Sequence, residues 1–199
     1  MVGVVRRPWN HSIQYHRLLL RELPSKCRRA LDVGCGDGGF ARELATRVPS
    51  VDALDRSERM IEIARGSNGA PNVRFLIGDL FEIDLPKAGY DFVASLSTIH
   101  HMDFGAAIER MRSLLRPEGV LAILGLARDR SPADFLVSAA AVPTNRAVRL
   151  WRGFYDPGFD IRDPAMTYGE VRRAANALLP GAAFRRLLYF RYLLVWRMP

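Results

Sequence analysis

The sequence predicts a single α/β domain with a doubly wound sheet of about seven mostly parallel strands and a helical insert after the fifth strand. Three observations predict this fold class. Apolar runs of strand length alternate with amphipathic stretches of helix length, as in repeated βα units. Several of the apolar runs end at a glycine or an aspartate. The chain has 199 residues, 49% of them hydrophobic, which suits one core of ordinary domain size.

The first half of the chain predicts three helices alternating with three strands. Pro24 and Pro49 follow the first two helices and mark where they stop, because proline cannot continue a helix. Ser57 is placed to cap the third helix, and Glu58 lies in its first turn. The helices are expected over residues 12–23, 40–47 and 57–65, and the strands over residues 29–33, 50–54 and 73–77.

The second half continues this alternation and then breaks it. Two strands are expected over 90–95 and 120–126, with a helix over 104–115 and a turn over 116–119 between them. Residues 128–165 interrupt the pattern with prolines and are interpreted as a helical, arginine-containing insert. The next helix, over 167–179, opens with the Thr167 and Glu170 spacing of a capping box. The β-prone tail over 184–196 supplies the last two strands, one of which can run antiparallel.

A glycine-rich turn follows the first predicted strand. Gly34, Gly36 and Gly39 satisfy the spacing G-x-G-x-x-G, a weak signal that binders of NAD and of many other ligands share. Glycines let the backbone approach a ligand, and the helix N-terminus beyond them offers free N–H donors. Asp32 and Asp37 crowd the same place, where their charges would repel a pyrophosphate and attract a cation. The pattern therefore favours a cationic ligand and disfavours a nicotinamide dehydrogenase.

The turn and the segments after it resemble one enzyme family. Residues 31–39, LDVGCGDGG, resemble the first motif of the class I S-adenosylmethionine-dependent methyltransferases, which has an acid two residues before the first glycine. Four later segments resemble further motifs of this family, in the same order along the chain. They are residues 53–57, 75–80, 90–95 with 99–101, and 114–119. The resemblance implies a Rossmann-like fold and methyl transfer from S-adenosylmethionine (SAM), with S-adenosylhomocysteine (SAH) as the product. SAM carries a sulfonium and an ammonium group, which agrees with the acids around the turn.

The resemblance also implies which residues hold SAM. Asp55 matches the family's acid that binds the ribose hydroxyls, and Asp79 matches the acid that meets the adenine amino group. In this family a first helix, here 12–23 with Tyr15 and His16, commonly folds over the cofactor; packing of this helix on the sheet is the alternative. The expected cofactor contacts are Tyr15, His16, Asp32, Gly34, Gly36, Asp55, Arg56, Met60, Gly78, Asp79, Leu80 and Ser95.

His100 and His101 are the candidate catalytic residues. They directly follow the fourth predicted strand, and related methyltransferases often carry a His-His pair there, near the acceptor. One of them could act as a general base or hydrogen-bond the acceptor. In the alternative interpretation, one packs under the sheet edge and fixes the loop. Methyl transfer from a sulfonium depends mainly on alignment, so no metal site is expected.

The single domain, 1–199, divides into four regions. They are an N-terminal helix or lid (1–28), a cofactor-binding core (29–127), a substrate-cap insert (128–165) and the last helix with the last strands (166–199). The insert could line a pocket for an apolar or anionic acceptor, and a solvated helix face over a buried aromatic stripe is the alternative. The residues concerned are Arg146, Arg149, Trp151, Arg152, Phe154, Tyr155 and Phe159. The favoured acceptor is a small molecule methylated on oxygen or nitrogen rather than carbon.

The charge distribution bears on possible partners. The net charge is +8, made up of +6 over residues 1–30, −4 over 31–127 and +6 over 128–199. Basic flanks could attract RNA, but the arginines are scattered, so a nucleic-acid partner is not favoured. An RNA methyltransferase and a non-catalytic SAM-binding partner subunit are the alternatives to the small-molecule enzyme. No apolar run of about 18 residues and no signal peptide occur, so no membrane association and a cytoplasmic location are expected.

Overall fold

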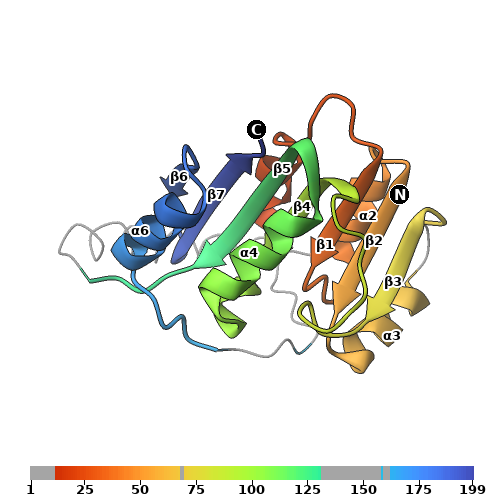
Figure 1. Cartoon of the computed structure of the whole chain (residues 1–199). Coiled ribbons are helices and arrows are strands. Elements are labelled where there is room, and N and C mark those ends of the chain that lie inside the picture. Colours follow the sequence, from red (N-terminus) through yellow and green to blue (C-terminus); the bar gives the residue numbers. More distant parts are fainter. Residues whose placement is uncertain (1–11, 68–69, 131–157, 159–161) are drawn as a thin grey trace, which may run out of the picture.

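The structure has a seven-stranded sheet with helices on both faces. The computed structural model describes residues 12–67, 70–130, 158 and 162–199 (Figure 1). The strands lie in the order β3-β2-β1-β4-β5-β7-β6, and β7 runs in the direction opposite to the other six. They are β1 (Arg29–Val33), β2 (Ser50–Asp55), β3 (Val73–Ile77), β4 (Tyr90–Leu96), β5 (Leu115–Leu126), β6 (Ala183–Arg186) and β7 (Arg191–Arg197). The predicted Rossmann-like, doubly wound and mostly parallel sheet is confirmed.

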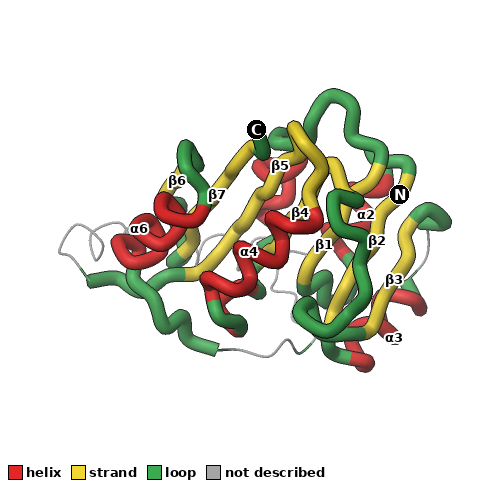
Figure 2. The backbone as a smooth tube through the Cα atoms, in the orientation of Figure 1, coloured by secondary structure: helices red, strands yellow, loops and turns green. Residues whose placement is uncertain are grey.

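Two helical layers cover the sheet, and Figure 2 shows them in red against the yellow strands. One layer packs with Leu31 and Val33 of β1, and the other packs with Ala30 of β1. This split follows from the alternation of side chains between the two faces of a strand. The first layer comprises α4 (Phe104–Leu114) and α6 (Tyr168–Leu178), and the second comprises η1 (Ile13–Tyr15), α1 (His16–Leu20), α2 (Gly39–Ala45) and α3 (Glu58–Gly66).

The sheet winds outward in two directions from β1. β1 pairs with β2 on one side and with β4 on the other, and both pairings are parallel. The strand order therefore reverses between β1 and β4. Ligands of open α/β sheets bind outside the carboxyl ends of the strands at such a reversal. The topology therefore predicts a ligand site among the segments that follow β1, β2, β3 and β4.

The helix caps predicted from the sequence are present. The Ser57 hydroxyl accepts a hydrogen bond from the Met60 N–H at the start of α3, with a distance of 3.4 Å. Thr167 and Glu170 form a full capping box at the start of α6, in which each side chain accepts a hydrogen bond from the other residue's N–H. Caps of this kind typically stabilise a helix by about 1 kcal/mol each.

The first helix is shorter than predicted. Its α-helical part ends at Leu20 rather than at residue 23. The N–H groups of Arg21 and Glu22 bond to the carbonyls of Leu18 and Leu19, three residues back instead of four. This tightening ends the helix just ahead of Pro24, which cannot follow in helical geometry.

β5 begins earlier than predicted. It starts at Leu115, which pairs with Tyr90, and so it takes in residues 116–119, which were expected to form a turn. The register then shifts before Phe92 pairs with Val120. Within the irregular stretch, Glu118 has a φ of 63°. The predicted turn therefore survives as an irregularity inside the strand.

A buried carboxylate on β2 joins three other strands. Asp52 accepts hydrogen bonds from Arg29 of β1 at 2.8 Å, from Arg74 of β3 at 2.8 Å and from Tyr90 of β4 at 2.7 Å. Burial alone would raise the pKa of Asp52, but the hydrogen bonds from Arg74, Tyr90 and Arg29 outweigh it and lower the pKa. Asp52 is thus a fully partnered carboxylate that holds β1 to β4 together.

Most of the predicted insert, 128–165, lies outside the described residues, including the arginines and aromatic residues named for it. The tail forms β6 and β7 as predicted, and β7 is the antiparallel one. Within the described ranges, none of the helices has the length and apolar character needed to cross a bilayer.

Candidate active site

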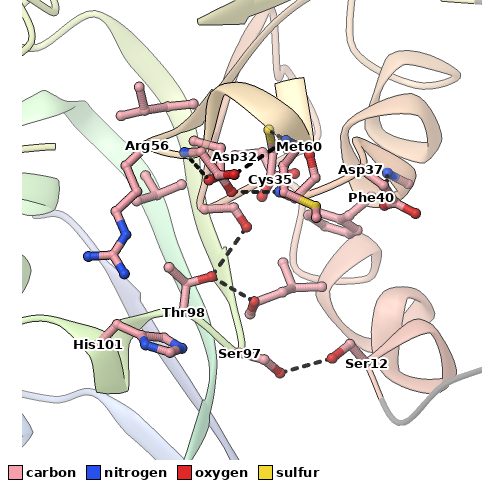
Figure 3. A pocket seen from close by; sticks show the side chains of 18 of the residues that line it. Ser12, Asp32, Cys35, Asp37, Phe40, Arg56, Met60, Ser97, Thr98 and His101 are labelled. Carbon is pink, nitrogen blue, oxygen red and sulfur yellow. Dashed lines mark hydrogen bonds between the residues drawn. The ribbon is translucent and has the colours of Figure 1, made fainter. Parts of the chain in front are cut away.

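A cavity of about 1640 Å³ lies at the carboxyl edge of the parallel strands. Its walls come from the segments after β1, β2, β3 and β4, from the end of β5 and from the start of β7 (Figure 3). We call the part at the ends of β1, β2 and β3 the β1–β3 side, and the part at β4, β5 and β7 the β4–β7 side. Single-ligand pockets usually measure about 300–1,000 Å³, so this cavity has room for two molecules.

The turn after β1 lines the β1–β3 side with backbone. Gly34 and Gly36 have φ values of 74° and 53°, in the left-handed region that favours glycine. A Cβ on Gly34 would overlap the side chain of Thr98, whose Oγ1 donates a hydrogen bond to the Gly34 carbonyl oxygen at 3.2 Å. The loop after β4 therefore packs directly on the turn after β1, and position 34 has no room for a side chain.

Asp32, the last residue but one of β1, is a buried carboxylate of a different kind from Asp52. It lines the cavity, is only 1% exposed, and neither of its oxygens has a hydrogen-bond partner. Burial, and then the nearby charges of Asp55 and Asp37, raise its pKa from 3.8 to about 8. The cavity therefore holds a carboxyl group that has no compensating partner, as expected of a group that meets a cationic ligand.

The other acids of the β1–β3 side hold the backbone of the loops in place. Asp55 accepts from the N–H groups of Gly36 at 2.8 Å and Ser57 at 2.9 Å, which joins the glycine turn to the end of β2. Asp37 accepts from Gly39 N–H at 3.1 Å, and Asp79 accepts from Phe81 N–H at 2.8 Å. Each carboxylate oxygen has a second lone pair, so these acids can still accept from a ligand.

The structure brings most of the predicted cofactor contacts together. The cavity is lined by His16, Asp32, Gly34, Gly36, Asp55, Arg56, Met60, Gly78, Asp79 and Leu80. Tyr15 and Ser95 do not line it. The Tyr15 hydroxyl donates to the Leu188 carbonyl oxygen at 3.2 Å, and Ser95 is fully buried. Ser95 pairs with Val33 and Asp32 pairs with Ala94, so Ser95 and Asp32 point to opposite faces of the sheet.

His16 lies on α1 at the edge of the cavity. Its Nδ1 is 3.2 Å from Oε1 of Glu43 on α2, and its ring meets Phe40 edge to face at 5.1 Å between centroids. The helix thus packs on α2 and also lines the cavity, which combines the two interpretations drawn from the sequence.

The two histidines line the β4–β7 side. They lie in η2 (Ile99–His101), with their ring centroids 4.2 Å apart. His100 has a buried Nδ1 without a hydrogen-bond partner. Burial, and then the charges of His101, Arg191 and Arg162, lower the pKa of His100 to about 4. His100 is therefore a neutral imidazole at physiological pH, with one buried ring nitrogen that lacks a hydrogen-bond partner.

Sequence reasoning missed a polar cluster beside the histidines. Ser12 and Ser97 lie 3.0 Å apart between their hydroxyl oxygens (Figure 3), and both contact the guanidinium of Arg191. Ser12 precedes η1, Ser97 follows β4 and Arg191 begins β7. Three residues so far apart in the chain carry no common motif, so only the fold reveals the cluster.

Comparisons with known proteins agree with this geometry. A family model described as a methyltransferase domain matches residues 30–119. An uncharacterised methyltransferase of Mycobacterium bovis is 36% identical over 195 residues, which cover 97% of this chain and 98% of that protein. The chain belongs to the class I SAM-dependent methyltransferases.

Two further proteins are similar to this methyltransferase at lower identity. The malonyl-[acyl-carrier protein] O-methyltransferase of Halalkalibacterium halodurans is 32% identical over 108 residues, covering 51% of this chain and 40% of that protein. The crystal structure of a SAM-dependent methyltransferase from Aquifex aeolicus superposes with a TM-score of 0.63 at 19% identity, covering 92% and 89% of the two chains. At this level of identity, the similarity to the crystal structure shows a shared fold alone.

The β1–β3 side of the methyltransferase fits SAM, its cofactor. A side-chain-free turn admits the ligand close to the backbone at Gly34 and Gly36. Asp32 offers a buried carboxyl group without a partner, which suits the ammonium group of the cofactor. Met60, 5% exposed, and Leu80, 4% exposed, add apolar surface. This side thus offers a buried carboxyl group and apolar surface to a cationic nucleoside.

Proposed function

We propose that the methyltransferase transfers the methyl group of SAM to an oxygen or nitrogen atom of a small molecule bound on the β4–β7 side. The observation that carries this proposal is the neutral imidazole of His100, which lines the cavity next to the cofactor residues and has a buried Nδ1 without a hydrogen-bond partner. A hydroxyl or an amine can donate to such a nitrogen, whereas a carbon acceptor cannot do so. The O-methyltransferase from Halalkalibacterium halodurans lends further support.

The proposed cofactor contacts follow the acids at the strand ends. Asp32 pairs with the ammonium group, Asp55 binds the ribose hydroxyls and Asp79 meets the adenine amino group. The free lone pairs of Asp55 and Asp79 support this assignment, because their backbone hydrogen bonds hold both carboxylates in fixed positions at the cavity wall.

The residues of the chain have a limited task in the reaction. When bound, SAM supplies a methyl group on a positively charged sulfur. The protein has to hold the acceptor in line with that methyl group and exclude water. His100 accepts a hydrogen bond from the acceptor and, where the acceptor must lose a proton, takes that proton at Nδ1. His101, whose ring lies 4.2 Å from that of His100 between centroids and is tilted by 41°, helps to fix the imidazole.

Calorimetry and a labelled-methyl assay test the proposal together. We expect SAH to bind with a dissociation constant of about micromolar order. Incubation with methyl-labelled SAM and fractionated metabolites should label a small molecule. Binding of SAH without transfer, with transfer appearing only after a second protein is added, would favour the non-catalytic subunit instead. Labelling of RNA, with binding that weakens steeply as salt rises, would favour the RNA enzyme.

Substitution of His100 separates its possible roles. His100→Ala should lower kcat by about 100-fold while the SAH dissociation constant stays unchanged. His100→Gln keeps a hydrogen-bond acceptor without basicity, so it should recover activity if the imidazole only orients the acceptor. Because the folded pKa is about 4, the wild-type activity that depends on neutral His100 should persist at pH 6 and fall as the pH approaches 4. Loss of that activity near pH 6.5 would contradict this assignment.

A further inference from the structure

Arg191 is a buried cation on the β4–β7 side of the cavity. It is the first residue of β7, lines the cavity and is 8% exposed. Its Nη1 donates to the Tyr189 carbonyl oxygen at 2.9 Å, and its Nη2 donates to the hydroxyls of Ser12 at 3.3 Å and Ser97 at 3.4 Å. Its Nε is buried without a partner. All three acceptors are neutral.

No carboxylate among the described residues pairs with Arg191. Arg186, five residues earlier, shows the ordinary arrangement, with Nη2 at 3.1 Å from a carboxylate oxygen of Asp129. A buried guanidinium that lacks an anion is unfavourable, because burial removes water without supplying an opposite charge. Burial lowers the pKa of Arg191 to about 10, with Tyr15 and Tyr168 acting in the opposite direction, so the group still carries its charge at neutral pH.

The backbone around Arg191 is held in strained conformations. Ser97, Tyr189 and Phe190 have φ values of 53°, 59° and 59°, in the left-handed region that non-glycine residues seldom adopt. Ser97 and Tyr189 are the residues that bond to the guanidinium, and Phe190 lines the cavity next to it. Strain that recurs around one cavity-facing side chain is typical of a ligand-binding site.

The two sides of the cavity therefore differ in charge. The β1–β3 side contains the buried carboxyl group of Asp32, 1% exposed, whereas the β4–β7 side contains the buried guanidinium of Arg191, 8% exposed, and the neutral His100. A positive charge near the sulfonium and ammonium groups of SAM would weaken cofactor binding unless an anion lay between them. Both ligands of the cavity can supply that anion, since the cofactor itself carries a carboxylate. We assign the anion to the acceptor because Arg191 lies on the β4–β7 side, beside His100, where the acceptor is proposed to bind.

We propose that Arg191, with Ser12 and Ser97, forms an oxyanion-binding site that selects an acceptor bearing a carboxylate. This inference rests on the proposed function, because it assigns a chemical class to the acceptor of the same site. The guanidinium is planar and presents parallel N–H donors, which match a carboxylate. Leu126 and Phe190 also line this side and offer apolar contact to the rest of the acceptor.

Matched acids and amides provide the test. With SAH-saturated protein, calorimetry or ligand-observed NMR compares benzoate with benzamide and octanoate with octanamide, and phenyl phosphate serves as the phosphate arm. We expect at least one acid to bind about tenfold or more tightly than its amide, which corresponds to roughly 1.4 kcal/mol. Tighter binding of phenyl phosphate than of either acid would overturn the carboxylate assignment and point to a phosphate ester.

Variants of Arg191 decide whether this side chain is responsible. Arg191→Met should abolish the preference for the acid, leave the SAH dissociation constant unchanged and leave the melting temperature equal or higher, because an uncompensated charge is removed. Arg191→Lys should keep part of the preference. Arg185→Met removes one exposed charge from the neighbouring strand β6 and should change none of these quantities.

Three results would overturn the inference. Equal binding of acid and amide, or no binding of any anion up to about 10 mM, would mean that no anion site exists. A lower melting temperature of Arg191→Met with an unchanged preference would make the residue purely structural. A large loss of SAH affinity in Arg191→Met would assign the guanidinium to the carboxylate of the cofactor. In each case normal SAH binding by the wild type would leave the methyltransferase assignment intact.

Discussion

Replacing Asp32 with asparagine is expected to weaken SAH binding by about 100-fold or more and to stabilise the free protein at the same time. The loss of affinity follows from removing the buried carboxyl group that faces the ammonium group of the ligand. The gain in stability follows because Asp32 is 1% exposed and has no hydrogen-bond partner at either oxygen. Isothermal calorimetry measures the first effect, and thermal or urea unfolding measures the second.

The pKa of Asp32 fixes the direction of both effects with pH. Because the folded pKa is about 8 and the ordinary value is 3.8, the folded chain holds a proton that the unfolded chain releases between these values. Stability therefore falls as the pH rises from about 4 to about 8, by a total of about 6 kcal/mol, and Asp32→Asn should remove this dependence. At pH 7, SAH binding to the wild type should release close to one proton, detected as a buffer-dependent binding enthalpy, and the variant should release none.

Asp52→Asn is the matched control. Asp52 is 2% exposed on the adjacent strand, but it bonds to Arg29, Arg74 and Tyr90. Removing its charge should destabilise the fold by about 3 kcal/mol and leave SAH affinity unchanged. If Asp32→Asn raises the free energy of unfolding and Asp52→Asn lowers it, the Asp32 carboxyl group serves ligand binding and the Asp52 carboxylate serves the stability of the fold. A loss of stability in Asp32→Asn like that in Asp52→Asn would contradict the ligand assignment.

The part of the site that could be predicted from the sequence is the part built from strand ends. Asp32, Asp55 and Asp79 each lie at or just after the end of a parallel strand, and parallel strands place their carboxyl ends on one edge. Strand order was not needed for this prediction, because any doubly wound arrangement would bring β1, β2 and β3 to the same side. The short glycine turn between β1 and α2 further predicted that the ligand lies close to the N-terminus of α2.

The roles of other residues could not be predicted from the sequence, because they depend on side-chain direction and on which distant segments the fold brings together. Ser95 was placed correctly at the end of β4, yet its side chain points to the other face, because one step along a strand reverses direction. Arg191 could not be singled out, since it begins a strand in an arginine-containing tail and its partners, Ser12 and Ser97, come from distant segments. The antiparallel insertion of β7 beside β5 brings these residues together.

Gly34→Ala is expected to give the second large effect, a loss of about 3 kcal/mol or more in the free energy of unfolding together with loss of SAH binding. Two causes add up. The φ of 74° is unfavourable for alanine, and the new Cβ would overlap the side chain of Thr98. Relief of that overlap would move the loop after β4 away from the turn after β1, which separates the two sides of the cavity. Urea unfolding and SAH calorimetry measure the two outcomes.

Gly181 provides the control for the backbone contribution. Its φ is 80°, close to that of Gly34, but a Cβ there would meet nothing within 4 Å. Gly181→Ala should therefore cost only about 1–2 kcal/mol, the price of the left-handed conformation, and leave SAH binding intact. The additional loss of unfolding free energy in Gly34→Ala, relative to Gly181→Ala, then measures the overlap with Thr98. Adding Thr98→Gly to the Gly34→Ala variant should recover much of that additional loss, because the overlap includes the Thr98 Cβ as well as its Oγ1 and Cγ2. Equal losses in Gly34→Ala and Gly181→Ala would show that the loop after β4 yields freely, and that the turn and the loop do not form one rigid wall of the cavity.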